Sequence, residues 1–309
     1  MTPKEILYPA PLKKGDKIAI CFPAGAIAPE KVEGAVATFK DYGWEPVVMP
    51  HALGKHGNYS GTDDERYSDL AAALSDPSVR AILCSRGGYG VVHIMDRLSK
   101  LPLAADPKWL IGFSDISALH ALLATNGVAS IHSPMAAQVM LGTSDADTAQ
   151  LFKILEGESP VYTFDAHPYD KLGLATGKLL GGNLAVLAEL INTPYDIIEP
   201  GTILFIEDVA EPIYKIERIL YQLKLSGVLD KLAGLIVGQF TDYKPDDNYT
   251  DMETMIRDMT SSLKVPVAFG APIGHVDHNV PVIESATVTL KVNPYAGNSI
   301  IFHRPILQK

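Results

Sequence analysis

Residues 81–124 read AILCSRGGYGVVHIMDRLSKLPLAADPKWLIGFSDISALHALLA and show the order strand, helix, strand, helix. The apolar run Ala81–Cys84 has strand length, ends in a glycine-rich turn and is followed by helical spacing over Val91–Leu98. A second apolar run, Trp109–Phe113, leads directly into the helical pattern Asp115–Ala124. Strands that alternate with helix-length segments predict βαβ units, in which helices cover a parallel sheet.

The same alternation extends toward the N-terminus. Lys17–Phe22 and Glu45–Met49 have the composition of buried strands, and Pro29–Tyr42 has the spacing of a helix. Thr62-Asp63-Asp64-Glu65 has the pattern of a capping box at the start of another helix. We therefore expect an α/β domain over residues 1–158 with a Rossmann- or flavodoxin-like parallel sheet.

The pattern changes after residues 159–173, which contain two prolines, lack a regular period and are expected to be a linker. More strands and fewer helices follow, so residues 174–309 predict a C-terminal domain of mixed, β-rich α/β structure. The strand-like runs are Val161–Phe164, Leu174–Leu180, Thr202–Ile206, Leu235–Val237, Val265–Phe269, Ala286–Val292 and Ser299–His303, and the helical patterns are Glu211–Leu225 and Thr250–Leu263.

Composition excludes several classes of protein. The 309 residues include 26 Lys and Arg against 36 Asp and Glu, a net charge of −10 that argues against nucleic-acid binding and against an anionic membrane surface. A hydrophobic content of 47% excludes a disordered chain. Two cysteines exclude a disulfide framework and a four-cysteine zinc site. No apolar run has the length of a signal peptide or membrane span, so we expect a cytoplasmic protein.

Glycine-rich segments are the first candidates for ligand binding. Gly173–Leu179 has one residue too few between its glycines for a P-loop, and no nucleotide or other cofactor is expected. Gly87-Gly88-Tyr89-Gly90 follows a strand, at the sheet edge where ligands of open α/β sheets bind. The glycines there either supply a positive φ for a tight turn or let backbone N–H groups approach a ligand closely.

Ser114 occupies a sharp turn between a strand and a helix. In Gly112-Phe113-Ser114-Asp115 the serine Oγ would be exposed, and the N–H of Asp115 would face a developing oxyanion from the helix N-terminus. Alternatively, Ser114 or Asp115 simply caps the helix. The segment departs from the G-x-S-x-G pattern, because Ile116 stands where the second glycine belongs.

A serine nucleophile needs a base and a carboxylate that orients it. His275 lies in a loop after an apolar run, where functional residues are frequent. Glu207 and Asp208 directly follow another apolar run, and adjacent strand residues face opposite sides; alternatively, both belong to a solvated strand end. The spacing of His275 and His278 does not match the i, i+4 pattern of a zinc helix, so no metal is expected.

Six segments in order across almost the whole chain resemble the LD-carboxypeptidases, or muramoyltetrapeptide carboxypeptidases. They are Lys14–Ile20, Arg86–Gly90, Ile111–Asp115, Gly177–Leu184 (GKLLGGNL), Leu204–Asp208, and Gly274-His275 with Asn279 and Pro281. The resemblance implies a serine peptidase with Ser114 as nucleophile, His275 as general base and acid, and Glu207 as the partner of His275. It also implies an oxyanion hole formed by the N–H groups of Gly88 and Asp115. These residues come from both predicted domains.

The resemblance further implies the substrate: a murein tetrapeptide, from which the family removes the terminal D-alanine. Arg86 would hold the free carboxylate, or else form a structural ion pair, for instance with Asp115. Asn183 would contact the ligand or only close a turn. The family's usual state, a homodimer, is expected by resemblance alone.

Three alternatives remain. A related immunity branch uses the same three residues to hydrolyse peptidyl- or aminoacyl-adenylate antibiotics, and the absence of an obvious insertion before Glu207 favours the carboxypeptidase. A non-catalytic peptide-binding protein would not need all of Ser114, Glu207 and His275. Cys84 could serve as a nucleophile instead, but its place within an apolar run indicates a packed side chain.

Overall fold

The structure is a computed structural model that describes residues 6–303, and it divides into two compact units. Unit 1 comprises Met1–Glu158 and Val280–Ser285, and unit 2 comprises Ser159–Asn279 and Ala286–Lys309. The division expected from the sequence assigned all of 174–309 to the second domain. Val280–Ser285 instead belongs to unit 1, because the strand β11 (Val282–Glu284) pairs with a strand of that unit.

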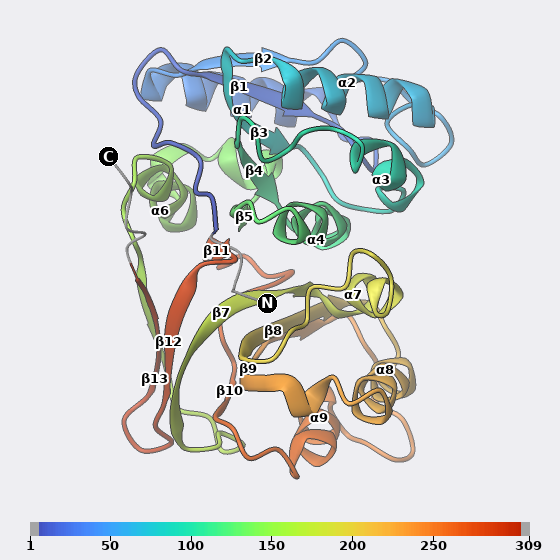
Figure 1. The fold of residues 1–309 in the computed structure, drawn as a ribbon, viewed down its shortest axis with the longest axis vertical. Coiled ribbons are helices and arrows are strands. Elements are labelled where there is room, and N and C mark those ends of the chain that lie inside the picture. Colours follow the sequence, from blue (N-terminus) through green and yellow to red (C-terminus); the bar gives the residue numbers. More distant parts are fainter. Residues whose placement is uncertain (1–5, 304–309) are drawn as a thin grey trace. The chain divides into compact units, whose positions relative to one another are not determined.

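Unit 1 contains a six-stranded sheet in the order β11-β5-β4-β3-β1-β2 (Figure 1). Five strands are parallel, in the order typical of flavodoxin-like folds, and only β11 runs antiparallel to its neighbour. The predicted parallel sheet is therefore confirmed. Its other strands are β1 (Lys17–Cys21), β2 (Glu45–Val48), β3 (Val79–Cys84), β4 (Trp109–Gly112) and β5 (Ser130–His132).

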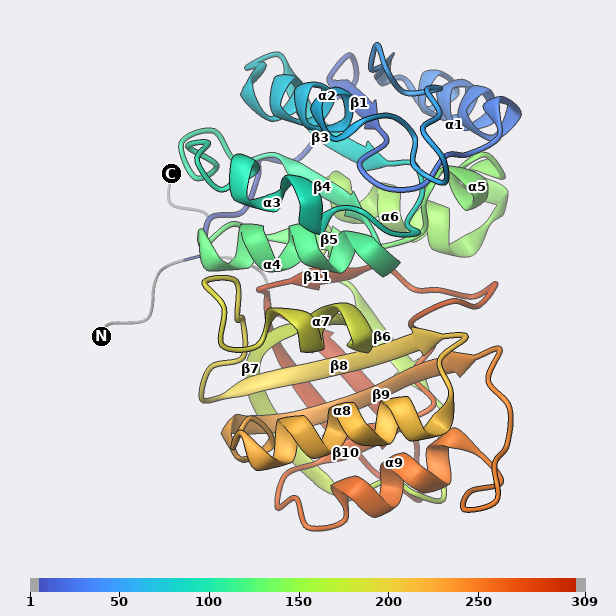
Figure 2. The same cartoon turned by 90° about the vertical axis from the view of Figure 1, so that its right-hand side faces the viewer.

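Helices cover both faces of this sheet. In Figure 2, α2, α3 and α4 lie together on one face, and α1, α5 and α6 lie on the other. The capping box at Thr62 is present and opens α2 as predicted. The helices are α1 (Pro29–Tyr42), α2 (Asp63–Ser75), α3 (Val92–Leu98), α4 (Ser117–Thr125), α5 (Ala136–Val139) and α6 (Ala146–Leu155), with 3-10 turns η1 (Ser114–Ile116) and η2 (Gly142–Ser144).

Strands β1, β3 and β4 are buried on both faces, which explains why they appear in the sequence as continuous apolar runs. The chain leaves β1 in one direction along the sheet and leaves β3 in the other, because β1 lies between β2 and β3. The loops after β1 and β3 therefore flank the switch point of the sheet, where open α/β folds bind their ligands.

Unit 2 contains a seven-stranded mixed sheet in the order β10-β9-β8-β7-β12-β13-β6. Strands β7 to β10 are parallel, and β12, β13 and β6 continue the sheet in antiparallel pairs. The predicted β-rich second domain is confirmed. Its strands are β6 (Val161–Phe164), β7 (Gly173–Asn183), β8 (Thr202–Val209), β9 (Leu232–Thr241), β10 (Val267–Phe269), β12 (Thr287–Val292) and β13 (Asn298–Phe302).

The helices of unit 2 are α7 (Leu184–Leu190), α8 (Ile213–Leu225) and α9 (Met252–Thr260), with a 3-10 turn η3 (Leu229–Lys231). They pack side by side against the parallel part of the sheet (Figure 2). The short helix α7 was not anticipated, and it follows β7 without a loop. Within residues 6–303, no helix combines the length and the apolar composition needed to cross a bilayer.

Candidate active site

Ser114 lies at the turn between β4 and α4, and its backbone is in the left-handed region with φ 68°. A non-glycine residue in this region costs of order 1 kcal/mol or more and persists only where the surroundings enforce it. The side chain is half-buried. This combination of strain and partial exposure is typical of a serine nucleophile on a strand-to-helix turn.

The His120 side chain is hydrogen-bonded to the residues beside this turn. Its Nε2 lies 2.8 Å from the Gly112 carbonyl oxygen, and its Nδ1 lies 2.8 Å from Ser130 Oγ. Complete burial lowers the pKa of His120 to about 4, so the ring is neutral at pH 7. Nε2–H then donates to Gly112, and Nδ1 accepts from the serine hydroxyl. His120 is therefore a packed residue that fixes the end of β4.

The Asp115 side chain connects the serine turn to the glycine-rich turn. Its Oδ2 accepts a hydrogen bond of 3.0 Å from the N–H of Val91, at the start of α3. The carboxylate thus contributes to capping the N-terminus of α3. The assignment of the Asp115 N–H to an oxyanion hole stays a prediction.

The glycine-rich turn approaches the serine closely. A Cβ placed on Gly87 would lie 2.7 Å from Ser114 Cβ and 2.8 Å from its Oγ, so only glycine fits there. Gly88 and Gly90 have φ values of +118° and +122°. The interpretation as a tight turn is therefore confirmed, and the turn also needs glycine because Gly87 lies close to Ser114. Approach of its N–H groups to a ligand stays a prediction. The exposed Arg86 donates from Nη1 to the Ala26 carbonyl at 2.5 Å.

Glu207 and His275 form a pair within unit 2. His275 Nδ1 lies 2.7 Å from Glu207 Oε2; the Glu207 side chain is fully buried and the His275 side chain is 21% exposed. A carboxylate only accepts hydrogen bonds, so Nδ1 is the donor and a neutral imidazole carries its lone pair on Nε2. This tautomer is the one that a general base in a serine hydrolase requires.

Irregular backbone brings the pair together. The register between β8 and β9 shifts between Ile206 and Asp208, and such irregularities re-aim side chains at the ends of strands. Gly274 has φ +131°, and a Cβ on it would lie 2.9 Å from Glu207 Cβ. The Gly274 N–H donates to Asn279 Oδ1 at 3.0 Å, which fixes the loop that carries His275.

Asp208, the next residue of β8, is also buried. It accepts hydrogen bonds from Asn183 Nδ2 and from the N–H groups of Ala185 and Val209, all between 2.8 and 2.9 Å. Burial raises the pKa of Asp208 to about 6, and the neighbouring Glu207 charge adds to the rise. The alternative of a solvated strand end for Glu207 and Asp208 is therefore wrong.

Asn183 is the N-cap of α7: its Oδ1 accepts from the Val186 N–H at 3.2 Å while its Nδ2 donates to Asp208. The turn-closing role is thus visible, and a ligand contact stays a prediction. Sequence reasoning missed the structural part of Asp208. The signal available for Asp208 was a second acid beside Glu207 at the end of an apolar strand.

Cys84 is fully buried in β3, and burial raises the pKa of its thiol. The thiolate, which is the reactive form, is therefore disfavoured, and this argues against Cys84 as a nucleophile. Among residues 6–303, no three His, Cys, Asp or Glu side chains gather in a way that would hold a metal ion.

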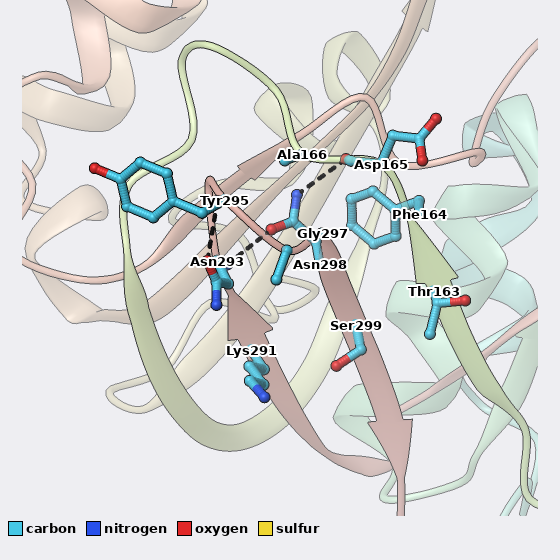
Figure 3. A pocket seen from close by; sticks show the side chains of 11 residues that line it. Thr163, Phe164, Asp165, Ala166, Lys291, Asn293, Tyr295, Gly297, Asn298 and Ser299 are labelled. Carbon is cyan, nitrogen blue, oxygen red and sulfur yellow. Dashed lines mark hydrogen bonds between the residues drawn. The ribbon is translucent and has the colours of Figure 1, made fainter.

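An open hollow of about 660 Å³ lies at one end of β6 and β13 in unit 2 (Figure 3). The Asn298 side chain lies between the two sides of its rim, where Nδ2 donates to the Asp165 carbonyl and Oδ1 accepts from the Asn293 N–H. None of the seven predicted site residues lines this hollow, so we assign it no part in the chemistry.

Comparisons with known proteins show the family to which this chain belongs. Residues 18–133 match the LD-carboxypeptidase N-terminal domain, and residues 176–290 match the LD-carboxypeptidase C-terminal domain. The murein tetrapeptide carboxypeptidase of Pseudomonas aeruginosa is 31% identical over 85% of this chain and 89% of its own length.

Two solved structures share the fold. The muramoyltetrapeptide carboxypeptidase from Oxalobacter formigenes has a TM-score of 0.82 at 28% identity and covers 93% of this chain and 98% of its own. The microcin C7 self immunity protein MccF has a TM-score of 0.83 at 21% identity and covers 96% of this chain and 98% of its own. The second likeness shows the fold alone.

Proposed function

The chain belongs to the LD-carboxypeptidase family and is a serine-type carboxypeptidase, and from this premise we propose that it releases the terminal D-alanine of murein tetrapeptides. The single observation that carries the proposal is the contact between His275 Nδ1 and the buried Glu207 Oε2. It orients an imidazole as a general base, and the strained Ser114 is the nucleophile that such a base would serve.

In the acylation step, Ser114 Oγ attacks the carbonyl carbon of the scissile amide while His275 Nε2 takes the hydroxyl proton. The Gly88 and Asp115 N–H groups stabilise the oxyanion of the tetrahedral intermediate. The intermediate collapses, the C–N bond breaks, and His275 returns the proton to the nitrogen of the leaving D-alanine. The Glu207 carboxylate stabilises the imidazolium that exists between these two transfers.

In the deacylation step, a water molecule replaces D-alanine. His275 removes one proton from the water, whose oxygen attacks the ester carbonyl of the acyl-enzyme. The second intermediate collapses, the proton goes back to Ser114 Oγ, and the tripeptide leaves with a new carboxylate. The same N–H groups act in both steps because the same carbonyl oxygen becomes negative in each.

Arg86 is the proposed site for the free carboxylate of the substrate. Its side chain is exposed, and Nη1 donates to the Ala26 carbonyl; a Cβ on the neighbouring Gly25 would lie 3.8 Å from Arg86 Nε and 2.9 Å from the Gly87 carbonyl oxygen. A guanidinium that spends one N–H on a carbonyl retains donors for a carboxylate. A protein of net charge −10 needs such a local positive group to bind an acidic peptide.

A cytoplasmic place in peptidoglycan recycling and a homodimeric state complete the proposal. Both cysteines are free and buried, which agrees with a reducing compartment. Analytical ultracentrifugation of the purified protein measures the oligomeric state directly. A monomer at micromolar concentration would remove the dimer from the proposal and leave the chemistry unchanged.

The test is D-alanine release from a purified murein tetrapeptide, followed by mass spectrometry for the wild type, Ser114→Ala and a control, Ser68→Ala. Ser68 is an exposed serine of α2 whose Oγ donates to the Glu65 carbonyl. We expect release by the wild type and Ser68→Ala, and a loss of at least about 10⁴-fold in Ser114→Ala.

Equal release by the wild type and Ser114→Ala would contradict the assignment of the nucleophile. No release by the wild type, together with hydrolysis of an aminoacyl-adenylate analogue, would replace the proposed substrate by that of the immunity branch. Inactivity on both substrates, with retained binding of the tetrapeptide, would indicate a peptide-binding protein.

A further inference from the structure

The peptide unit between Gly87 and Gly88 is held from the carbonyl side. The N–H of Gly25, in the loop after β1, donates to the Gly87 carbonyl oxygen at 3.0 Å. In the described part of the chain the Gly88 N–H donates to no other residue. A peptide unit is planar, and in the trans form its C=O and N–H point in opposite directions. The bond from Gly25 therefore also sets the direction of the Gly88 N–H.

We propose that the segment Phe22–Ala26, which we call the β1 loop, is the positioning element of the oxyanion hole. This inference rests on the proposed function, since it gives the Gly88 N–H its part in stabilising the oxyanion. Gly25 is the residue through which the loop acts, and it touches neither the substrate nor the reacting atoms. No local pattern around Gly25 points to this role, because its partner is 62 residues away in the chain.

The segment before α2 fixes the β1 loop from its other side. The Ser60 hydroxyl donates to the Phe22 carbonyl and lies 3.2 Å from the Ala24 carbonyl, which also accepts from the Ser60 N–H at 3.1 Å. Ser60 is 1% exposed, so these bonds are shielded from water. Gly25 and Tyr59 form a bridge of the antiparallel type.

Arg66 joins the β1 loop to the far end of the glycine-rich turn. Its Nη1 donates to the Pro23 carbonyl at 2.5 Å and to the Gly90 carbonyl at 2.9 Å, and its Nη2 pairs with Asp63 Oδ1 at 2.5 Å. The residue is 3% exposed. A buried guanidinium with rigid, forked donors holds two carbonyls at a fixed separation. The glycine-rich turn is thus tied to the β1 loop at both Gly87 and Gly90.

The contact between Gly25 and the Gly87 carbonyl leaves no room for an added methyl group on Gly25. A Cβ on Gly25 would lie 2.9 Å from the Gly87 carbonyl oxygen, and a Cβ on Gly88 would lie 3.4 Å from Gly25. Gly25→Ala therefore displaces the Gly87 carbonyl and rotates the whole peptide unit. Because oxyanion donors must lie within a few tenths of an ångström of their position, this rotation costs transition-state stabilisation.

The experiment compares Gly25→Ala with the wild type and with the control Gly34→Ala. Gly34 lies on α1, where a Cβ would meet Met140 Cβ at 2.6 Å, a clash within the same unit but away from the glycine-rich turn. We expect kcat of Gly25→Ala for D-alanine release to fall by about 10²- to 10³-fold with KM changed by less than about threefold. We expect Gly34→Ala to keep the wild-type kcat per folded molecule.

A second readout separates positioning from a general structural effect. Affinity for a tetrahedral phosphonate analogue of the tetrapeptide should fall by the same factor as kcat, while affinity for the tripeptide product stays unchanged. Retention of kcat within about threefold would overturn the inference. A parallel loss of analogue and product affinity would also overturn it, because it would show general disorder of the site.

A third readout keeps the inference testable if the proposed substrate is wrong. Labelling of Ser114 by a fluorophosphonate probe passes through the same oxyanion hole and needs no peptide. Slower labelling of Gly25→Ala, by about 10²-fold, supports the inference even where the wild type releases no D-alanine. Unchanged labelling overturns it, and so does a wild-type Ser114 that is not labelled at all.

If Gly25→Ala does not fold, Ser60→Ala takes its place. This variant removes the hydroxyl that holds the Phe22 and Ala24 carbonyls but adds no atom. We expect a fall of about tenfold in both kcat and labelling rate, with Ser68→Ala as the matched control. A wild-type rate in folded Ser60→Ala would overturn the role of the β1 loop.

Discussion

The conformation of the main chain sets the position of Ser114, whereas a hydrogen bond between two side chains sets the orientation of His275. Around Ser114 the controlling features are a φ of 68°, glycines that admit no Cβ, and carbonyls held by buried donors. Around His275 they are the fully buried Glu207 carboxylate at 2.7 Å and the buried carboxylate of Asp208, the next residue of β8. The first region should therefore be sensitive to added atoms, and the second to changes of charge and hydrogen bonding.

The chemistry assigned to each region explains this difference. An oxyanion is best stabilised by N–H groups that do not move during the reaction, and backbone N–H groups in a tight turn meet that need. A general base must present one particular ring nitrogen, and only a hydrogen bond to the other nitrogen selects that tautomer. The two regions should therefore respond to different kinds of substitution.

The largest effect is expected for Glu207→Gln. The amide keeps the volume of the carboxylate but removes its charge, so it neither enforces the tautomer nor stabilises the imidazolium. We expect kcat to fall by about 10⁴-fold with little change in the unfolding midpoint, measured by D-alanine release and urea titration. Glu211→Gln, an exchange of the acid that pairs with Lys215 at 3.1 Å, is the matched control and should retain activity. A similar loss in both variants would contradict a specific role for Glu207.

Gly87→Ala is the corresponding test of the first region. The new Cβ would lie 2.7 Å from Ser114 Cβ, so the turn or the serine must move. We expect kcat to fall by about 10²- to 10³-fold, because the Oγ and the N–H donors lose their relative placement. Gly61→Ala, whose Cβ would lie 3.0 Å from Glu65 Oε2 and 3.3 Å from Glu65 Cβ and thus away from Ser114, is the control. Near-normal activity of Gly87→Ala would refute the idea that close approach requires glycine here.

Much of this fold was readable from local patterns. The buried parallel strands appear as apolar runs, and the capping box at Thr62 is explicit in the sequence. Patterns failed where an element depends on distant partners. Strand β11 has three residues, and it exists because Val282–Glu284 pairs with β5 of unit 1, about 150 residues earlier in the chain. Three residues have no period, so no local signal predicts such a strand.

Sequence motifs identified the candidate residues, but they did not predict the contacts that surround these residues in the structure. That Glu207 is buried depends on Gly274 allowing close approach, and that the Gly88 N–H has a fixed direction depends on Gly25. Neither contact involves neighbours in sequence. The sequence therefore predicts which groups carry the chemistry, while the contacts that orient these groups arise only from tertiary structure.

The two regions should also differ in how pH affects stability, beginning with His120. Its pKa is lowered to about 4 in the folded state. The contribution of His120 to the free energy of unfolding is therefore fully present above about pH 6.5 and is lost as the pH falls toward 4. The loss is about 3 kcal/mol. Both tryptophans, Trp44 and Trp109, lie in unit 1, so their fluorescence reports its unfolding in urea. His120→Gln does not titrate, so its free energy of unfolding should fall less between pH 6.5 and 4 than that of the wild type. An identical dependence on pH in both proteins would contradict the lowered pKa of His120.

In unit 2, Asp208 should make the free energy of unfolding depend on pH in the opposite direction. Its pKa is raised to about 6, so the stability that it contributes is fully present below about pH 4 and is lost as pH rises through 6, again by about 3 kcal/mol. Amide hydrogen exchange of α7 measures this locally, because Asp208 accepts from the Ala185 N–H. We expect α7 in the wild type to lose protection between pH 4 and 6, relative to Asp208→Asn, after correction for intrinsic exchange. Parallel profiles of the two proteins would show that Asp208 does not titrate in this range.

The smallest effect concerns the strain at Ser114. A φ of 68° suits glycine and penalises any residue with a Cβ, so Ser114→Gly should relieve the penalty and Ser114→Ala should not. We expect the free energy of unfolding of unit 1 to rise by about 1 kcal/mol in Ser114→Gly relative to Ser114→Ala, although glycine's larger freedom in the unfolded chain offsets part of the gain. Both variants lack the hydroxyl, so its loss cannot cause a difference in stability between them. Equal stability in urea, followed by tryptophan fluorescence, would mean that the turn is not strained. If Ser114→Gly is more stable than Ser114→Ala, the left-handed backbone that places the Ser114 Oγ at the turn lowers the stability of the wild type. Around Glu207 and His275 the positive φ lies at Gly274, where glycine adopts it without a steric penalty.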